Sequence, residues 1–372
     1  MAEVTLDSLG EIGRLLAGME KLSASDLHLK AHSAPLYRIH GELQRIKAEP
    51  YAPEALDCLI LASLRASDQE RLEKDGSLDF ALSITGVGRF RVNVFRQRDS
   101  LSMAARRVNN RIPTTDQLNL PKAVNRLAAF DNGLVLVVGS TGSGKSTSLA
   151  SIINRINLTR KSHILTIEDP IEYQYVDEKS FVSQREVGLD APSFSVALKH
   201  SLRQDPDVIL IGELRYIDTI ETALSASETG HLVFATLHAS TAQQSVSRIL
   251  DFFPGDRQPQ VRLLLAATLR AVLAQKLVPG CTAEAPRVPA VELLFVTSVI
   301  RKMIEEARDA ELSEAMRRMS TEGMQDFNIA LNQLVKLKLI TEETAIEHSL
   351  LPEQLRMLFR GMVLNEDKGA FG

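Results

Sequence analysis

The chain has 372 residues, 44% of them hydrophobic and 24% charged, with a formal net charge of −4. This composition is typical of a folded globular protein, and the length predicts more than one domain. The acidic balance argues against general attraction to nucleic acid, no apolar run reaches the roughly 20 residues of a membrane span, and two cysteines cannot form a four-cysteine zinc site.

Residues 1–108 are predicted to form a small α+β domain. Its first segment is acidic with leucines at helical spacing, unlike a secretory signal, so we expect a cytoplasmic protein. The expected elements are short strands at 26–29 and 36–40, a pair of helices within 53–73, and a hairpin of 79–84 with 88–95. A polar stretch that ends at Pro113 indicates a linker over 109–120.

Residues 121–372 are predicted to form the second domain. Short apolar strands alternate with helical segments there, which is typical of an α/β fold with a parallel sheet. The predicted strands are 134–138, 163–167, 208–211 and 232–237. The pattern from 258 to 372 is almost purely helical, so we expect an all-α tail after the core, with 364–372 frayed.

The stretch from Gly139 to Ser146 carries the main functional motif. It reads G-S-T-G-S-G-K-S, the spacing of a phosphate-binding P-loop, and it lies between an apolar strand and a helix. Glycines let backbone N–H groups cradle phosphate oxygens, the lysine adds a positive charge, and the serine hydroxyl can bind Mg²⁺. We therefore predict ATP and Mg²⁺ as cofactors, with the nucleotide held by Gly139, Ser140, Thr141, Gly142, Ser143, Gly144, Lys145, Ser146 and Thr147.

Acidic side chains follow two of the predicted core strands. Glu168, Asp169 and Glu172 follow the second one, where the carboxyl ends of parallel strands line a ligand crevice. They can hold Mg²⁺ or polarise a water molecule, although Asp-Pro is also an ordinary turn. Glu213 follows the apolar run 208–211 in the Walker B pattern, for which a solvated strand end is the alternative. The predicted metal ligands are Ser146, Glu168 and Glu213.

Two histidines flank the apolar run 232–237. His238 follows the run on the side expected for the phosphates, so it is a candidate sensor of the γ-phosphate. His231 precedes the run, at the opposite end of the strand. A histidine beside a buried strand is otherwise most often a satisfied core residue.

Seven arginines and no lysine occur between residues 89 and 111. Arg89 and Arg91 alternate with apolar residues, which predicts that they share the polar face of a strand. Because guanidinium groups bind phosphate well, arginines of a separate domain could complete the nucleotide site of a neighbouring subunit. The alternatives are a solvated surface or a nucleic-acid patch, but Trp is absent and interleaved aromatic residues are few.

Together these motifs resemble the secretion-ATPase superfamily, and most closely the type IV pilus retraction ATPases of the PilT/PilU kind. The resemblance covers nearly the whole chain. Besides the motifs above, it rests on Ala-Ser-Asp-Leu-His-Leu at 24–29, Gly-Arg-Phe-Arg-Val-Asn at 88–93 and Gln-Arg-Glu-Val-Gly at 184–188.

The resemblance implies a PAS-like N-terminal domain and a RecA-like core, assembled as a homohexameric ring. It implies an ATPase at the cytoplasmic face of the inner membrane that powers pilus retraction and twitching motility. The implied partners are a polytopic platform protein and a paralogous retraction ATPase, with no direct contact to nucleic acid. The implied site residues are Glu172 as catalytic base, Glu213 as the Walker B glutamate, the histidines His231 and His238, and the trans-acting arginines Arg89, Arg91 and Arg106.

The branch within this family stays open. Pilus-assembly and type II secretion ATPases typically carry a zinc insertion with four cysteines, which this chain cannot form. Residues 299–306 are similar to a late helix of retraction ATPases, although an ordinary amphipathic helix has the same pattern. Tyr216 departs from the retraction form, which usually has Asp at this position. The segment 235–239 leans toward the accessory PilU-like branch. The alternatives to a main retraction motor are an accessory ATPase, a non-hydrolysing regulatory subunit and a nucleic-acid translocase.

Overall fold

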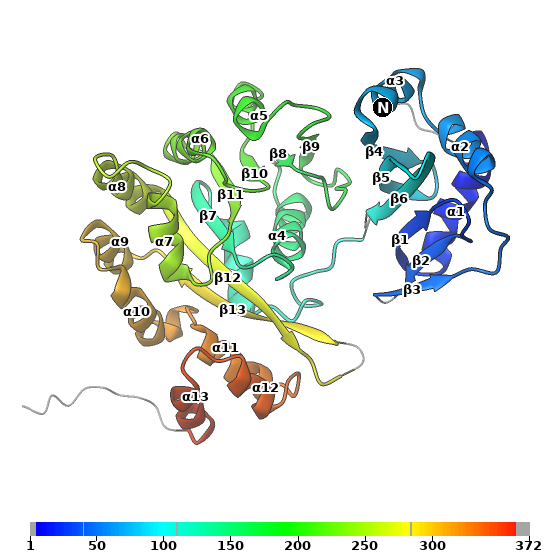
Figure 1. The fold of residues 1–372 in the computed structure, drawn as a ribbon. Helices are drawn as coiled ribbons and strands as arrows, with labels where there is room; N and C mark the ends of the chain where they lie inside the picture. Colours follow the sequence, from blue (N-terminus) through cyan, green and yellow to red (C-terminus); the bar gives the residue numbers. More distant parts are fainter. Residues whose placement is uncertain (1–4, 40, 109–110, 283–284, 362–372) are drawn as a thin grey trace, which may run out of the picture. The chain divides into compact units, whose positions relative to one another are not determined.

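The computed structural model describes residues 5–39, 41–108, 111–282 and 285–361. In it the chain divides into two compact units, each with its own sheet and hydrophobic core (Figure 1). The main division falls between Arg111 and Ile112, inside the segment predicted as a linker. Of that segment, Asn109 and Asn110 lie outside the described residues. No helix in the described part of the chain is long and apolar enough to cross a membrane.

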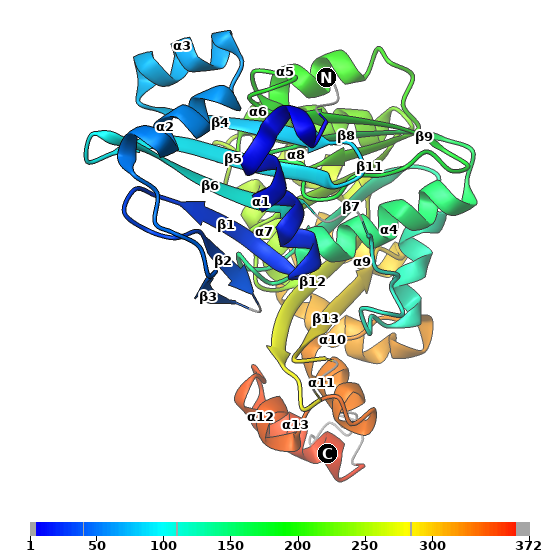
Figure 2. The same cartoon turned by 90° about the vertical axis from the view of Figure 1, so that its right-hand side faces the viewer.

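The first unit is an antiparallel sheet with helices, as predicted (Figure 2). Its strand order is β3-β2-β1-β6-β5-β4. The strands are β1 Ala24–Leu29, β2 Leu36–Ile39, β3 Glu42–Arg45, β4 Ser77–Ile84, β5 Gly88–Gln97 and β6 Ser100–Val108. The helices are η1 Asp7–Leu9, α1 Gly10–Lys21, α2 Pro53–Ala62 and α3 Ala66–Asp75. The sequence pattern missed β3 and β6, and His40 of the second predicted strand is not among the described residues.

Side chains alternate across this sheet, since successive residues of a strand point to opposite faces. On β5, Phe90, Val92 and Val94 are fully buried, whereas Arg91 between them is exposed. Helix α1 packs against β1 and α2 against β6. The sheet therefore buries an apolar face and leaves a polar one.

The second unit is built on a sheet of order β13-β12-β7-β11-β10-β8-β9. Neighbouring strands in it are parallel except for β12 and β13. The strands are β7 Gly133–Val138, β8 His163–Glu168, β9 Phe181–Glu186, β10 Val208–Ile211, β11 Leu232–Leu237, β12 Leu269–Pro279 and β13 Arg287–Phe295. The helices up to β12 are η2 Lys122–Ala129, α4 Lys145–Thr159, α5 Phe194–Ser201, α6 Ile217–Glu228, α7 Ala242–Leu250 and α8 Gln258–Thr268.

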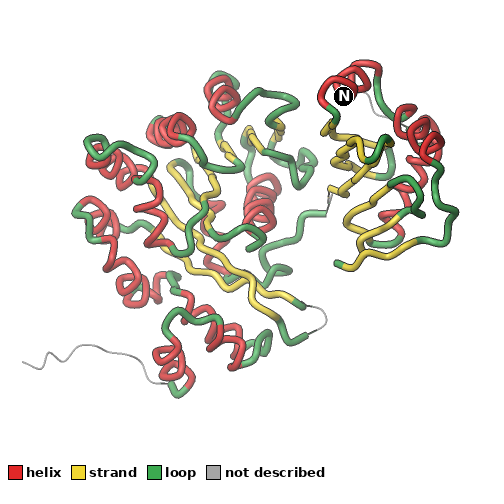
Figure 3. Tube along the Cα trace, in the orientation of Figure 1, coloured by secondary structure: helices red, strands yellow, loops and turns green. Residues whose placement is uncertain are grey.

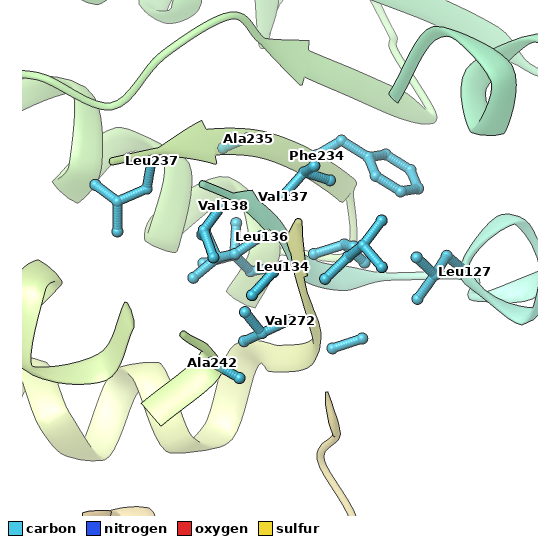
Figure 4. Packing of buried hydrophobic residues seen from close by; sticks show 14 of the residues in the cluster. Leu127, Leu134, Leu136, Val137, Val138, Phe234, Ala235, Leu237, Ala242 and Val272 are labelled. Carbon is cyan, nitrogen blue, oxygen red and sulfur yellow. The ribbon is translucent and has the colours of Figure 1, made fainter. Parts of the chain in front are cut away.

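Helices cover both faces of this sheet. Helix α4 packs on β7 from one side, and α6 packs on β7 and β11 from the other (Figure 1). Every residue of β7, β10 and β11 is buried, which explains their continuous apolar runs. Figure 4 shows Phe234 of β11 beside Val137 of β7 on one side of the sheet, and Leu134 and Leu136 of β7 with Val272 of β12 on the other.

The prediction of an almost purely helical region from residue 258 onward is wrong for β12 and β13. These two long strands form an antiparallel pair at one edge of the sheet (Figure 3). Their alanines, leucines, Gln275 and Lys276 favour helix, but pairing of β12 with β7 and β13 outweighs that local preference. The remaining helices are α9 Ser298–Glu305, η3 Asp309–Glu311, α10 Leu312–Arg318, η4 Ser320–Glu322, α11 Phe327–Lys336, α12 Glu342–Glu347 and α13 Pro352–Phe359. The tail predicted to be frayed, 364–372, lies outside the described residues.

Candidate functional site

The P-loop connects β7 to α4, as its spacing predicts. Gly139 and Gly144 have φ angles of 154° and 84°, which side chains with a Cβ rarely adopt. A Cβ on Gly139 would also lie 2.3 Å from the backbone oxygen of Gln275. Helix α4 begins at Lys145, so its unpaired N–H groups face the loop where a phosphate would bind.

The polar side chains of the loop differ in exposure. Lys145 Nζ donates hydrogen bonds to the carbonyl oxygens of Gly139 at 2.9 Å and Ser140 at 2.8 Å. Ser140 and Thr141 are exposed, and Ser146 and Thr147 in the first turn of α4 are half-buried. The Ser143 hydroxyl is buried and has no hydrogen-bond partner in the described part of the chain. The side chains other than Ser143 are thus open enough to meet a ligand.

The carboxyl ends of β7, β8, β10 and β11 meet at the edge that carries the P-loop. The parallel registers set Leu237 beside Val138 and Ile211 beside Ile167. The segments after β8 and β10 touch, since a Cβ on Gly212 would lie 3.2 Å from Glu168 Cα. The structure therefore brings the P-loop, Glu168, Glu213 and His238 to one edge of the sheet.

Glu213, which follows β10, contacts the side chains of Arg215 and His238 through its carboxylate. Its Oε2 lies 2.6 Å from an Arg215 guanidinium nitrogen, and its Oε1 lies 3.0 Å from His238 Nε2. The Glu213 side chain is only 18% exposed. The hydrogen bond with Glu213 is the main effect that raises the pKa of Arg215. The sequence motifs predict Glu213 and His238 as site residues but not Arg215, although Arg215 lies only two residues after the Walker B glutamate.

The segment after β8 contains the other predicted carboxylates. Glu168 Oε1 accepts hydrogen bonds from Thr166 Oγ1 at 2.7 Å and Gln184 Nε2 at 3.3 Å, while Glu172 is exposed. The peptide bond between Asp169 and Pro170 is cis. Ser146, Glu168 and Glu213 carry oxygen donors of the kind that Mg²⁺ prefers when it is bound together with phosphate oxygens.

His231 is not brought to this edge. It precedes β11, whose first residue Leu232 lies beside Gly133 at the start of β7. At about 3.3 Å per residue, that end of the strand is roughly 20 Å from the P-loop end. The His231 ring Nδ1 lies 3.0 Å from the backbone oxygen of Ala226. Within its own subunit, the predicted catalytic role of His231 therefore has no geometric support.

Three arginines of the first unit lie in one row with the carboxylate of Asp26. Asp26 of β1 is paired with Arg38 of β2 and Arg106 of β6, and Arg106 is paired with Arg91 of β5. The Arg106 Nε lies 2.7 Å from Asp26 Oδ1. Burial, the largest effect, would raise the pKa of Asp26, but hydrogen bonds from Ser25 and Arg106 and nearby charges lower it overall. We call Arg38, Asp26, Arg106 and Arg91 the Asp26 row.

Arg89 differs from the arginines of the Asp26 row. It lies on the same strand as Arg91 but is only 7% exposed. Arg91 is exposed, and the side chain of Arg106 is 71% exposed. Arg89 and Arg91 lie two residues apart on β5 and so share one face of the strand as predicted, but only Arg91 is exposed.

Comparison with known proteins identifies the family. Residues 11–343 match the family model described as Type II/IV secretion system protein. The chain is 41% identical to the type IV pilus ATPase PilU of Pseudomonas aeruginosa, over 94% of this chain and 91% of that protein. It is 39% identical to the type IV pilus retraction ATPase PilT of the same organism, over 92% of this chain and 99% of that protein.

Solved structures agree with these matches. The crystal structure of the pilus retraction motor PilT with bound ADP has a TM-score of 0.86 and 43% identity, covering 92% of this chain and 98% of that one. The ATPase DotB of Legionella pneumophila has a TM-score of 0.75 and 27% identity, covering 97% of this chain and 98% of that one. The chain therefore belongs to the Type II/IV secretion system protein family.

Proposed function

We propose that this chain is an ATP-hydrolysing motor that powers type IV pilus retraction. The observation that carries the proposal is the set of strand ends at one sheet edge, where the P-loop meets Glu168, Glu213 and His238. Its likeness to PilT and PilU over more than nine-tenths of its length supports the cellular role.

The residues at the carboxyl ends of the strands have different proposed roles in ATP hydrolysis. The P-loop N–H groups and Lys145 bind the phosphates, and the Lys145 ammonium exchanges its loop carbonyls for phosphate oxygens. Glu172 is exposed and follows the end of β8 by four residues. It accepts a proton from the attacking water. His238 contacts Glu213, so a change at the γ-phosphate can reach both side chains.

Mg²⁺ belongs to the proposed site. When bound, it would neutralise charge that develops on the β- and γ-phosphates, with Ser146, Glu213 and Glu168 as its protein ligands. Glu213 is paired with Arg215 in this structure, so binding of the metal has to compete with that ion pair.

We further propose that the working unit is a homohexameric ring. Arg91 and Arg106 are exposed on the first unit, and in a ring they can reach a neighbouring subunit's nucleotide. A ring at the cytoplasmic face of the inner membrane could then act on a platform protein there. Subunit movement after phosphate release would supply the force.

An accessory role is the second candidate. The identity to PilU is 41% and that to PilT is 39%, so these values do not separate the two branches. The accessory ATPase would act with a paralogous retraction motor rather than replace it.

Deletion of the gene tests the proposal, together with steady-state ATP turnover by the purified chain. Hyperpiliated cells that do not twitch, with turnover by the wild-type protein, support the main motor. Normal piliation with altered or intact motility supports the accessory role. Bald cells would overturn retraction in favour of assembly, and a chain that binds nucleotide without turnover would be a regulatory subunit.

A further inference from the structure

Gln275 is a polar side chain in the buried interior of the core sheet. It lies on β12, directly after Ala274, which is paired with Val138, the last residue of β7 before the P-loop. Gln275 is 3% exposed, and its neighbours Leu273 and Ala274 are completely buried. A buried amide needs hydrogen-bond partners for both its donor and its acceptor.

Both ends of the Gln275 amide bond to the phosphate-binding segment. Nε2 donates to the Ser143 carbonyl oxygen at 2.7 Å, and Oε1 accepts from Ser148 Oγ at 2.7 Å. Ser143 belongs to the P-loop, and Ser148 to the first turn of α4. The amide thus ties the loop to the helix whose N-terminus would face the phosphates.

The backbone of the loop approaches the same strand closely. A Cβ on Gly144 would lie 2.8 Å from Gln275 Nε2. A Cβ on Gly139 would lie 2.3 Å from the Gln275 backbone oxygen. These two glycines are therefore needed for close packing against β12 as well as for their positive φ angles.

We propose that Gln275 is a positioning residue for nucleotide binding. In a trans peptide the C=O and the next N–H point in opposite directions. The bond that draws the Ser143 carbonyl toward β12 therefore directs the Gly144 N–H away from β12. Gln275 thereby orients the Gly144 N–H for phosphate binding before the nucleotide binds. Gln275 itself is not proposed to contact the nucleotide. The inference rests on the proposed ATPase function.

Gln275→Glu and Ser148→Ala each remove one of the two hydrogen bonds of the Gln275 side chain, and a third substitution removes both. Gln275→Glu has nearly the same shape and keeps an acceptor for Ser148, but once ionised its carboxylate cannot donate to the Ser143 carbonyl. Because burial raises the pKa of a carboxyl group, this variant is measured on the alkaline side of neutral pH. Ser148→Ala removes only the bond from the helix. Gln275→Met removes both bonds while keeping the volume similar.

Gln325 offers a matched control. It is also a buried glutamine, 6% exposed, and its Nε2 donates to the Val291 carbonyl oxygen at 2.8 Å. Neither it nor Val291 belongs to the P-loop or to the strand ends beside it. Val291 is paired with Gln275 across β12 and β13, so Gln325→Met makes the same chemical change close to Gln275 but removes no bond to the phosphate-binding loop.

The experiment measures ADP affinity by calorimetry, KM and kcat for ATP, and the melting temperature for each full-length variant. We expect Gln275→Met and Gln275→Glu to weaken ADP binding and raise KM about tenfold, since one buried hydrogen bond is lost at the loop. Ser148→Ala should have a smaller effect, and Gln325→Met should lower the melting temperature without changing KM.

Two results would overturn the positioning role. One is unchanged ADP affinity and KM in folded Gln275→Glu; the other is an equal change of both in Gln325→Met. If the Gln275 variants do not fold, Ser148→Ala takes their place, because the bond from Ser148 orients the amide that donates to Ser143. Unchanged ADP affinity in Ser148→Ala would then overturn the positioning role. A wild-type chain that neither binds ADP nor turns over ATP would instead contradict the proposed function.

Discussion

The two sheets of this protein place their polar groups differently. In the second unit, β7, β10 and β11 are buried along their whole length, and the candidate site residues Glu213 and His238 follow the ends of β10 and β11. In the first unit, β5 buries every second residue and carries Arg91 on its other face. A parallel sheet covered by helices on both faces has room for function only at its ends, whereas a half-covered antiparallel sheet can use a face.

A substitution of Glu172, which follows the end of β8, should give the largest loss of ATP turnover. Replacing it with Gln removes the proposed general base, so we expect kcat for ATP to fall by about 10²–10⁴-fold with ADP affinity nearly unchanged. Glu178→Gln is the control, because Glu178 is an exposed glutamate in the same segment between β8 and β9. Wild-type turnover in Glu172→Gln would remove this residue from the mechanism.

Arg91 tests the open face of the first sheet. Arg91→Ala should lower kcat by about a hundredfold, less than a full arginine finger, since Arg106 remains. Arg96→Ala is the control, as Arg96 is also exposed on β5 but is paired with Leu101, outside the Asp26 row.

Mixing variants shows whether Arg91 acts between subunits. In a mixed ring, an Arg91→Ala subunit supplies an intact Glu172, and a Glu172→Gln neighbour supplies an intact Arg91. Recovered ATP turnover on mixing is expected if the arginine acts in trans. No recovery from mixed rings of confirmed composition would place its action within one subunit.

Glu292 is an exception to the rule for the second sheet, since it is a carboxyl group inside a strand. It lies on β13, is 3% exposed, and accepts a hydrogen bond from the Ala242 N–H at 2.6 Å. Burial raises its pKa to about 7; the bond from Ala242 lowers it, nearby Asp326 raises it, and Lys276 and Arg317 lower it.

The raised pKa of Glu292 makes stability depend on pH. Between its ordinary value of 4.5 and about 7, the folded state binds more protons than the unfolded state. The protonated Glu292 side chain therefore contributes fully to the free energy of unfolding below pH 4.5. This contribution is lost as the pH rises through about 7, where the buried carboxyl group ionises. Glu292→Gln should raise the free energy of unfolding by about 2–3 kcal/mol at about pH 8 and change it little at about pH 4. Denaturant unfolding at both pH values measures this, and equal changes at the two would refute it.

Local patterns predicted much of the fold. The apolar runs of β7, β8, β10 and β11 were recognisable because strands buried on both faces need continuous apolar residues. The strands β12 and β13 were not, since Leu, Ala, Gln and Lys favour helix and only their pairing partners make them strands. The edge strand β9 was missed for a similar reason, as four of its six residues are half-buried and give no clear alternation.

The candidate site shows the same division. The P-loop, Glu213 and His238 are recognisable in the sequence because each has a characteristic position next to an apolar strand. Contacts between distant segments could not be predicted in this way: Arg215 and His238 share Glu213, His231 lies at the far end of its strand, and Gln275 bonds to Ser143. The physical reason is distance along the chain: Gln275 and Ser143 are 132 residues apart, and only the register of a folded sheet brings such residues together.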